Sequence, residues 1–121
     1  MANVLIVDDS KASRRHIRRA VESAGHTVAG EEDNGESGYL KYKEIKPDIV
    51  TMDIVMPGLG GLEALQLIKE SDENARVIVI SAAAQKEKVA RAMEIGALQF
   101  IPKPCTEQEI SQAVDDAANL Q

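Results

Sequence analysis

Residues 4–11 of the chain read VLIVDDSK, so four consecutive apolar residues run directly into two aspartates, Asp8 and Asp9. An apolar run without alternation is typical of a strand that is buried on both faces, as the strands of parallel sheets are. Two carboxylates about 4 Å apart repel each other by roughly 4 kcal/mol at an effective dielectric constant near 20. This stretch therefore predicts a buried strand whose end carries charges that a cation must balance.

The remainder of the chain alternates strand-like and helix-like segments in the same way. Apolar runs predict five strands, at residues 3–8, 26–31, 48–53, 76–81 and 98–103. Apolar residues at helical spacing predict a helix after each strand, at residues 11–24, 36–45, 62–70, 85–95 and from 106 onward. Five strand–helix units with short connections predict an α/β fold, a doubly wound five-stranded parallel sheet with helices on both faces.

The spacing of apolar residues also predicts which side of each helix faces the core. The expected inward-facing residues are Ile17, Ala20, Val21, Ala24, Leu40, Ile45, Val89, Ala92, Met93, Ile110, Ala113, Val114 and Ala117. Ser10 is a suitable N-cap for the first helix, and Thr106 with Glu109 can form a capping box for the last. Gly38 is expected to weaken the second helix by about 1 kcal/mol relative to alanine.

Length and composition restrict the class of protein. The 121 residues fit one domain, 1–121, without room for a second module. The net charge of −6 argues against direct binding of nucleic acid, and no apolar run approaches the roughly 20 residues of a membrane span. The amino terminus does not resemble a signal peptide, and the single cysteine, Cys105, excludes an internal disulfide bond. These features predict a cytoplasmic protein.

Positive charge is concentrated in one segment. Residues 11–19, KASRRHIRR, carry five Lys and Arg residues and no acidic residue, which leaves a charge of −11 for the rest of the chain. The four arginines, Arg14, Arg15, Arg18 and Arg19, have two possible explanations. They form either an ordinary solvated helix face or a docking surface for an acidic partner, because such asymmetry steers association.

Polar residues stand at the ends of four of the five predicted strands. Asp8 and Asp9 end the first strand, Asp53 the third, Ser81 the fourth and Lys103 the fifth. In an open parallel sheet the carboxyl ends of all strands lie on one edge, where ligands bind at the topological switch point. Each residue alone is explained as a polar group where a buried strand reaches the surface. Together, three carboxylates, a hydroxyl and an ammonium group are chemically complementary and predict one site.

The chemistry of that site favours a hard metal ion. Carboxylate ligands without a neighbouring pair of Cys or His residues suit Mg²⁺. With one Mg²⁺ and the ammonium group of Lys103, the three aspartate charges sum to zero. A site that holds Mg²⁺, an ammonium group and a hydroxyl donor is suited to stabilising negative oxygens around phosphorus.

These motifs resemble the receiver domain of two-component response regulators, specifically the free-standing chemotaxis (CheY-like) type. The resemblance covers essentially all 121 residues. It rests on DD at 8–9, MDIVMPGLGG at 52–61, VISA around Ser81 and FIPKP at 100–104. It implies a flavodoxin-like (βα)5 fold with strand order 2-1-3-4-5 and a single receiver domain without an output domain.

The resemblance also implies a role for each site residue in phosphorelay signal transduction. Asp53 would take a phosphoryl group from a sensor histidine kinase or a phosphotransfer domain. Mg²⁺ would be held by Asp9, Asp53 and the backbone carbonyl of Val55, and by Asp8 largely through metal-bound water. Lys103 and Ser81 would each contact a phosphoryl oxygen. The protein would be a phosphoacceptor with self-catalysed phosphotransfer and not an enzyme in the usual sense.

The same resemblance implies a switch near the carboxyl end of the sheet. Phe100 would turn inward when Ser81 moves towards the phosphoryl group, and the small Ala82 would make room for the ring. The alternative is that Phe100 is simply a core aromatic residue. The output surface would comprise the fourth helix, fifth strand and fifth helix, and its target would be a flagellar motor switch or a phosphorelay protein. The Lys103–Pro104 bond is expected to be cis.

Three positions depart from the common receiver pattern. Val55 and Ala83 are apolar where many receivers have polar groups, so neither can orient a hydrolytic water molecule, and we expect a long-lived acyl phosphate. Cys105 is expected to be a small buried apolar residue.

Three other functions compete with this interpretation. A receiver-like scaffold that is never phosphorylated is disfavoured by the complete set of site residues. A haloacid-dehalogenase-type phosphatase needs an Asp-x-Asp motif that VLIVDDSK lacks. Dinucleotide binding is disfavoured because no G-x-G-x-x-G follows the first strand.

Overall fold

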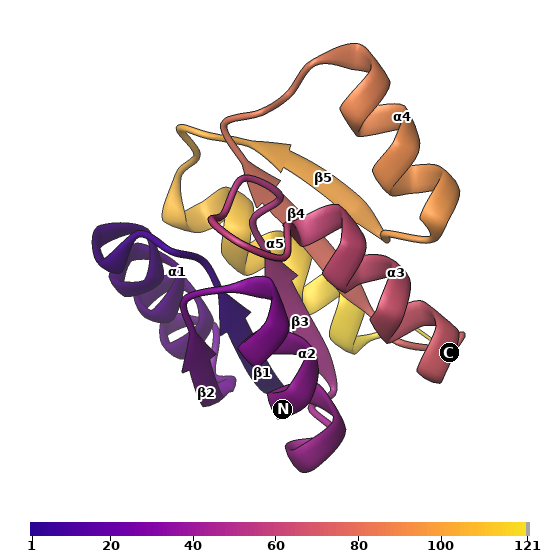
Figure 1. Cartoon of the computed structure of the whole chain (residues 1–121). Coiled ribbons are helices and arrows are strands. Elements are labelled where there is room, and N and C mark those ends of the chain that lie inside the picture. The colour runs from indigo at the N-terminus through magenta and orange to yellow at the C-terminus, as the bar shows by residue number, and fades with distance from the viewer. Residues whose placement is uncertain (121) are drawn as a thin grey trace.

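The computed structural model describes residues 1–120, so Gln121, the last residue of the predicted domain, lies outside the described part. Strands and helices alternate through this part (Figure 1). The strands are β1 (Asn3–Val7), β2 (Thr27–Glu32), β3 (Ile49–Met52), β4 (Val77–Ser81) and β5 (Gln99–Pro102). The helices are α1 (Lys11–Ser23), α2 (Gly35–Ile45), α3 (Gly61–Ser71), α4 (Lys86–Ile95) and α5 (Glu107–Ala118). The predicted alternation is confirmed, with bounds that differ by a residue or two.

The five strands form one parallel sheet in the order β2-β1-β3-β4-β5, which confirms the predicted fold. At the carboxyl edge, Val7 is paired with Met52, and Ser81 is paired with Pro102. The ends of β1 and β3 are therefore adjacent, as are those of β4 and β5. This register places the residues that follow these strands on one edge of the sheet.

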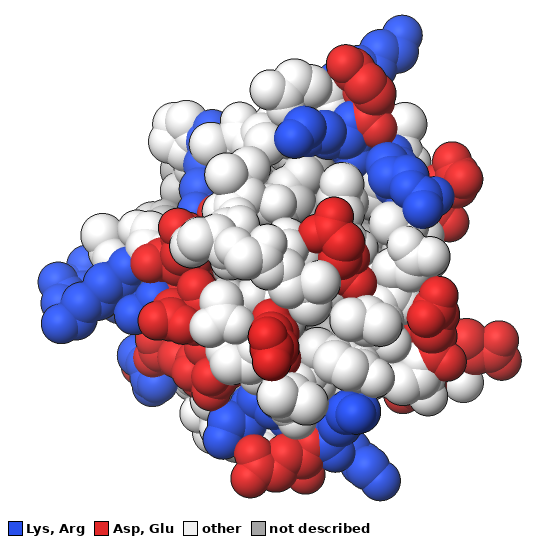
Figure 2. Space-filling view, in the orientation of Figure 1, with Lys and Arg blue, Asp and Glu red and all other residues white. Residues whose placement is uncertain are grey.

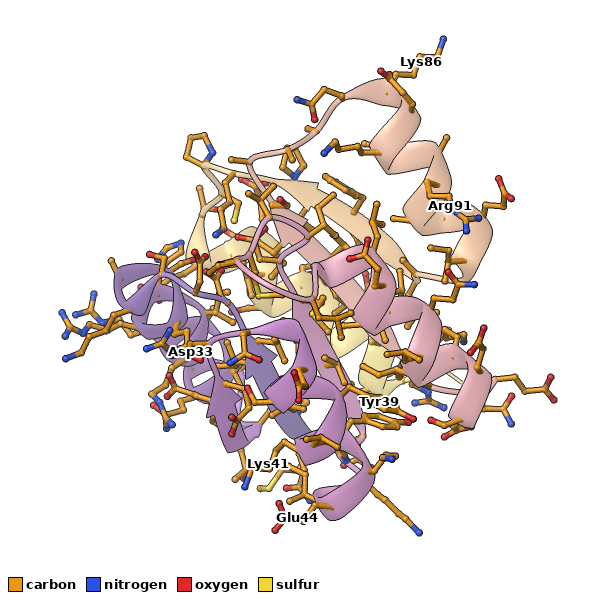
Figure 3. All side chains as sticks on the ribbon, in the orientation of Figure 1. Asp33, Tyr39, Lys41, Glu44, Lys86 and Arg91 are labelled. Atoms are coloured by element: carbon orange, nitrogen blue, oxygen red, sulfur yellow. The ribbon has the colours of Figure 1, made fainter. Side chains whose placement is uncertain are left out.

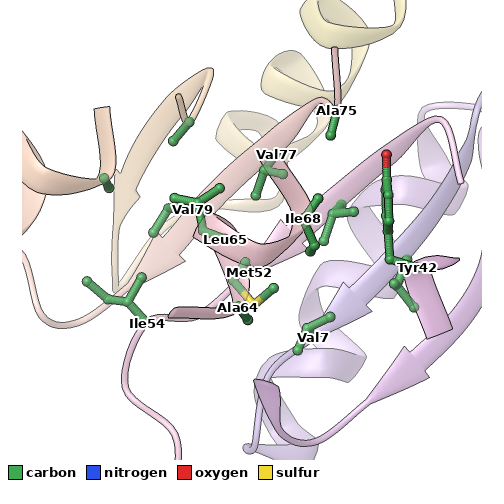
Figure 4. Packing of buried hydrophobic residues seen from close by; sticks show 14 of the residues in the cluster. Val7, Tyr42, Met52, Ile54, Ala64, Leu65, Ile68, Ala75, Val77 and Val79 are labelled. Carbon is green, nitrogen blue, oxygen red and sulfur yellow. The ribbon is translucent and has the colours of Figure 1, made fainter. Parts of the chain in front are cut away.

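Helices cover both faces of the sheet, and each face has its own apolar core. Helices α1 and α5 pack on one face through a cluster that includes Ile17 and Ile110. Helices α2, α3 and α4 pack on the other face, where Leu65 and Ile68 contact the strands in a cluster seen in Figure 4. Every residue of β3 and β4 is buried, as unbroken apolar runs predict for central strands.

Local signals at the helix ends match the prediction. The side chain of Ser10 accepts a hydrogen bond from the backbone N–H of Ser13, and Thr106 forms the expected capping box with Glu109. Gly96 follows α4 with a φ of 127°, a conformation that favours glycine. These caps satisfy backbone groups that a helix end otherwise leaves unpaired.

The expected inward position of Leu40 in α2 is wrong, whereas Ile45 is half-buried and packs against the core as expected. Leu40 is 52% exposed, and the helix instead faces the core through Gly38 and Tyr42. The reason is steric: a methyl group at Gly38 would lie 2.8 Å from Cγ1 of Val7, so only glycine lets α2 approach β1 this closely. Burial and the hydrogen bond from the Tyr42 hydroxyl to Asp72 raise the pKa of Tyr42 to about 12.

The expected inward position of Met93 in α4 is also wrong. Met93 is 43% exposed, Val89 is half-buried, and Ala92 is the only residue of α4 that is fully buried. Lys86 points away from the molecule at the start of this helix (Figure 3). Helix α4 packs mainly against α3 and the edge strand β5, which leave most of its surface in solvent. Within residues 1–120, no helix is long and apolar enough to cross a membrane.

Candidate functional site

The polar residues predicted at the strand ends lie together at the carboxyl edge of the sheet. Asp8 and Asp53 directly follow β1 and β3, Ser81 ends β4, and Lys103 follows β5. Backbone hydrogen bonds from Asp53 N to Val7 O and from Lys103 N to Ser81 O hold these ends in register. Asp8 and Ser81 are fully buried and Asp53 is 6% exposed. Buried charged groups of this kind require partners.

Lys103 joins two of the carboxylates. Its Nζ donates to Asp8 Oδ2 at 2.8 Å and to Asp53 Oδ2 at 3.0 Å. Burial lowers the pKa of Lys103, but the hydrogen bonds and charges of Asp8 and Asp53 raise it more, so the net pKa lies above its ordinary value. The ammonium group therefore stays charged at neutral pH and offsets part of the negative charge of the site.

The second carboxylate oxygen of Asp53 is held by the neighbouring strand and loop. Ser81 Oγ donates to Asp53 Oδ1 at 2.7 Å, and the backbone N–H of Val55 donates to the same oxygen at 3.0 Å. The N–H of Ala83 in turn donates to Ser81 Oγ at 3.2 Å. Asp53 thus has one oxygen oriented by a hydroxyl and an amide and the other by an ammonium group.

Asp8 is fixed by the start of α1. Its carboxylate accepts from the backbone N–H of Ser10 at 2.9 Å and from Ser13 Oγ at 2.8 Å. Arg14 Nη1 donates to the backbone carbonyl of Asp8 at 2.7 Å. Ser13 was not among the predicted site residues, because its only signal is a hydroxyl in the first turn of the helix that follows the aspartate pair.

The third carboxylate completes a group that fits a divalent cation. One oxygen each from Asp8, Asp9 and Asp53 lies within 4.8 Å of the others, and Asp9 is exposed. Ligands of an octahedral Mg²⁺ are about 3.0 Å apart when neighbouring and about 4.2 Å apart when opposite, so the three oxygens lie close to the spacing that one ion requires. Val55 lies beside this group because its amide is bound to Asp53. The donor set is all oxygen, which is the set that Mg²⁺ prefers.

The predicted switch residues are placed differently from one another. Phe100 is half-buried and packs against the core cluster of α2, α3 and α4, to which the buried Ala83 belongs. Ala82, which was expected to make room for the ring, is exposed and lines a cavity of about 390 Å³ on the side of α1. In this structure Ala83, and not Ala82, belongs to the cluster that Phe100 contacts, and the role of Ala82 in making room for the ring stays a prediction. The Lys103–Pro104 bond is cis, as the resemblance implies.

The arginines of α1 separate into two pairs. Arg14 and Arg18 form ion pairs with Glu31 of β2, at 3.2 Å and 2.6 Å. The hydrogen bond to Glu31 is the main cause that raises the pKa of Arg18. Arg15 and Arg19 are exposed, and Figure 2 shows Lys and Arg side chains projecting where α1 lies. Of the predicted docking residues, two are thus already paired within the chain.

Cys105 is half-buried between α1 and α5. Its backbone carbonyl contacts Nε2 of His16 at 2.8 Å. Burial, with the nearby charge of Glu109, raises the pKa of the Cys105 thiol, and the charge of Lys103 opposes this only partly. The thiol is therefore protonated at neutral pH, and Cys105 is half-buried where full burial was expected.

Comparison with known proteins identifies this arrangement. Residues 4–115 match the model of the family described as the response regulator receiver domain. The chemotaxis protein CheY of Thermotoga maritima is 45% identical over 112 residues, which make up 93% of each chain. The chemotaxis protein CheY of Bacillus subtilis is 40% identical over 116 residues, 96% of this chain and 97% of that protein.

The solved structures agree. A chain in the crystal structure of the CheX–CheY–BeF3–Mg²⁺ complex from Borrelia burgdorferi superposes with a TM-score of 0.93 at 38% identity. The match covers 98% of this chain and 90% of that chain. Sequence, fold and the arrangement of the strand ends thus lead to the same assignment. The chain belongs to the response regulator receiver domain family and is of the CheY-like type.

Proposed function

We propose that the protein is a two-component phosphoacceptor in chemotaxis or a phosphorelay, which receives a phosphoryl group on Asp53 from a histidine kinase or phosphotransfer domain. The observation that carries this proposal is the bridge from Lys103 to Asp8 and Asp53, with Ser81 on the other oxygen of Asp53. This arrangement orients a carboxylate nucleophile and supplies a cation and a hydroxyl for the oxygens of an incoming phosphoryl group.

In the proposed reaction, an oxygen of Asp53 forms a bond to phosphorus while the bond from phosphorus to the donor's imidazole nitrogen breaks. Lys103 then pairs with a phosphoryl oxygen, which it reaches from its place beside Asp53 Oδ2. Phosphoryl transfer depends mainly on positioning and charge stabilisation, and these are what the buried residues supply. Asp8, Asp9, Asp53 and the carbonyl of Val55 would hold Mg²⁺. The ion would supply further positive charge for the phosphoryl oxygens.

The response would begin at Ser81. Its hydroxyl donates to Asp53 in the unphosphorylated protein and would donate to a phosphoryl oxygen afterwards. The Ala83 amide is bound to that hydroxyl, and Ala83 belongs to the cluster that Phe100 contacts. A shift of Ser81 would thus be transmitted to Phe100 and to α4. The face of α4, β5 and α5 would then bind its target, such as a flagellar switch or phosphorelay protein; the Borrelia burgdorferi relative is complexed with CheX.

The first test is chemical phosphorylation. Incubation with acetyl phosphate and Mg²⁺ should add one phosphoryl group to the wild type by intact mass and none to Asp53→Asn. Removal of Mg²⁺ with a chelator should abolish the modification. An unmodified wild type would support the constitutive scaffold, and continuous turnover of acetyl phosphate without a labelled protein would support a phosphatase.

We expect the acyl phosphate to be lost slowly. Val55 is 54% exposed at the site and Ala83 is buried, and neither side chain can hold a water molecule for attack on phosphorus. Radiolabel on the isolated phosphoprotein should persist, and Val55→Asn, which adds a polar group at the exposed position, should shorten its lifetime. Loss of label from the wild type within seconds would contradict this expectation.

The exposed basic residues of α1 are the proposed docking surface for the phosphodonor. Lys11, Arg15 and Arg19 are four residues apart and exposed, so they form one stripe, whereas Arg14 and Arg18 are engaged by Glu31. This stripe is positive on a chain whose other residues are negative overall, and such a positive surface favours an acidic partner. Helix α1 also lines the apolar cavity beside Lys103, so the same helix carries the basic stripe and borders this cavity.

Charge reversal tests the docking surface. Arg15→Glu with Arg19→Glu should slow phosphotransfer from the kinase at least tenfold at low salt and leave labelling by acetyl phosphate unchanged. Lys86→Glu with Lys88→Glu on α4 is the control with the same charge change. Equal loss with both donors, or equal loss in the control, would count against docking through α1.

A further inference from the structure

We infer that Gly35 is a positioning residue for the loop that carries Asp53 and Val55, an inference that rests on the proposed Mg²⁺-dependent phosphoacceptor function. Gly35 is the first residue of α2 and is buried. Its effect would be indirect: its missing side chain allows the start of α2 to support the β3–α3 loop, residues 53–60.

The contact between α2 and this loop is made by backbone atoms. A methyl group at Gly35 would lie 2.3 Å from the carbonyl oxygen of Leu59 and 3.0 Å from that of Gly60. Real side chains essentially never approach closer than 3.0 Å, and carbonyl groups cannot rotate away as a flexible side chain can. Gly35 is itself buried, so the methyl group has no alternative space. Any side chain at this position must displace the loop.

The loop is also tightly packed at its other contact, between Gly61 of α3 and the backbone of Asp53. A methyl group at Gly61 would lie 2.0 Å from the carbonyl oxygen of Asp53, so the first residue of α3 rests directly on the phosphoacceptor backbone. The start of α2 is itself fixed, because Asn34 Oδ1 accepts from the N–H of Ser37 at 2.8 Å. The segment between Asp53 and Gly61 is therefore held against two helix starts.

A displaced loop would change the metal site. To reach an ordinary contact of 3.4 Å with Gly35→Ala, the Leu59 carbonyl must move by about 1 Å. Four residues earlier, the amide of Val55 holds Asp53 Oδ1, and the carbonyl of Val55 is a proposed metal ligand. A misplacement of about 1 Å in such a site can cost about a hundredfold in rate.

The same helix offers a matched control. A methyl group at Gly38 would lie 2.8 Å from the Val7 side chain, which is a milder steric conflict, with a side chain of β1 and not with the backbone of the loop. Because this conflict is with the Val7 side chain and not with the Val7 carbonyl that binds Asp53 N, Gly38→Ala should destabilise the protein without moving residues 53–60. Both variants are glycine-to-alanine changes in α2, one turn apart.

The experiment measures Mg²⁺ affinity and stability for wild type, Gly35→Ala and Gly38→Ala. Calorimetric titration with Mg²⁺ alone should give a Kd about tenfold higher for Gly35→Ala and unchanged for Gly38→Ala. Urea denaturation should show a loss of stability in both. Labelling of Gly35→Ala by acetyl phosphate should be slow at low Mg²⁺ and largely recovered at saturating Mg²⁺. The same Kd in all three proteins, or the same increase in both variants, would overturn the inference.

If Gly35→Ala does not fold, Asn34→Ala provides the test without adding an atom to the contact. This substitution removes the N-cap hydrogen bond of α2 and should loosen the support of the loop. The Kd for Mg²⁺ should then rise roughly two- to threefold, because the loss of one cap has a small effect on stability. An unchanged Kd in folded Asn34→Ala would overturn the inference. Failure of the wild type itself to bind Mg²⁺ would instead refute the proposed function.

Discussion

Helices α1 and α4 both follow a strand that delivers a site residue, but they are held very differently. Helix α1 buries Ile17, Ala20 and Val21 and has a side-chain cap from Ser10. Helix α4 buries only Ala92, and Gln85 at its start makes no capping hydrogen bond. The helix beside the aspartates is thus packed and capped, whereas the helix after the serine is largely on the surface.

The contacts of α1 extend to the site and to its neighbour. Ser13 and Arg14 are bonded to the side chain and backbone of Asp8, and Ser111 Oγ of α5 donates to the carbonyl of Ala20 at 2.8 Å. At α4, the segment that follows Ala83 is exposed from residue 84 to residue 88. Weakly packed elements open at low free-energy cost, and elements that move in a response are drawn from them. The part of the site that carries Asp8 is therefore firmly packed by α1, whereas the part that follows Ser81 leads into a loosely packed helix.

The largest expected effect comes from truncating one apolar side chain in each helix. Ile17→Ala should lower the free energy of unfolding by about 3 kcal/mol, because Ile17 is buried and its removal leaves a cavity. Met93→Ala should change it by less than about 0.5 kcal/mol, because Met93 is exposed. Urea denaturation measures both. Similar losses in the two variants would contradict the comparison.

Hydrogen exchange tests the difference in mobility directly. Backbone amides in the middle of α4 should exchange about a hundredfold faster than those around Ile17–Val21 of α1, because α4 opens without exposing a large apolar surface. Exchange followed by NMR under native conditions gives both rates in one sample. Helix α3, which buries Leu65 and Ile68, is the internal control and should behave like α1. Equal protection of α1 and α4 would contradict the conclusion that α4 is the more loosely held helix.

Binding of Mg²⁺ should increase the difference in exchange protection between the start of α1 and α4. At ten times its Kd, the ion should raise the free energy of unfolding by about 1.4 kcal/mol, since it binds only the folded protein. The added protection from exchange should appear at residues 8–14 and in the β3–α3 loop, close to the carboxylates, and not in α4. Asp9→Asn, which removes the exposed carboxylate of the cluster, should abolish most of it. Equal protection of α4 would show that the two halves are already coupled in the unphosphorylated protein.

The smallest effects are expected at the caps. Ser10→Ala should cost about 1 kcal/mol, because the helix loses the acceptor for its Ser13 amide. Gln85→Ser should add roughly 0.5 kcal/mol, because Gln85 has the extended backbone of an N-cap but no capping bond. Thermal unfolding at several urea concentrations resolves such differences. A destabilised Gln85→Ser would show that α4 is already held at its start by other contacts.

Predictions from the sequence were most reliable for the buried strands and for the polar residues that follow them, because burial alone explains both. The unbroken apolar runs predict the central strands, and the polar residues directly after them predict the site at the carboxyl edge. Predictions were least reliable on the surfaces of the helices. Leu40 and Met93 are apolar at plausible helical spacing, yet both are exposed, because a contact with one neighbour decides how each helix is turned.

The sequence also did not predict which arginines of α1 form ion pairs. Arg14 and Arg18 look like free surface charges, but β2 places Glu31 next to both. Nothing local distinguishes them from Arg15, which is exposed. The separation in sequence between α1 and Glu31 is bridged only when the edge strand docks beside β1.

The amino-acid sequence is enough to predict the alternation of strands and helices and the chemical identity of the residues at the strand ends. It is enough because burial of apolar strands and solvation of their ends are local requirements. Only the packed fold shows which oxygen of Asp53 meets Lys103 and which meets Ser81, which arginines pair with Glu31, and how closely α2 approaches the loop at Leu59. Those features depend on distances between segments far apart in the chain, and only the packed sheet and helices set such distances.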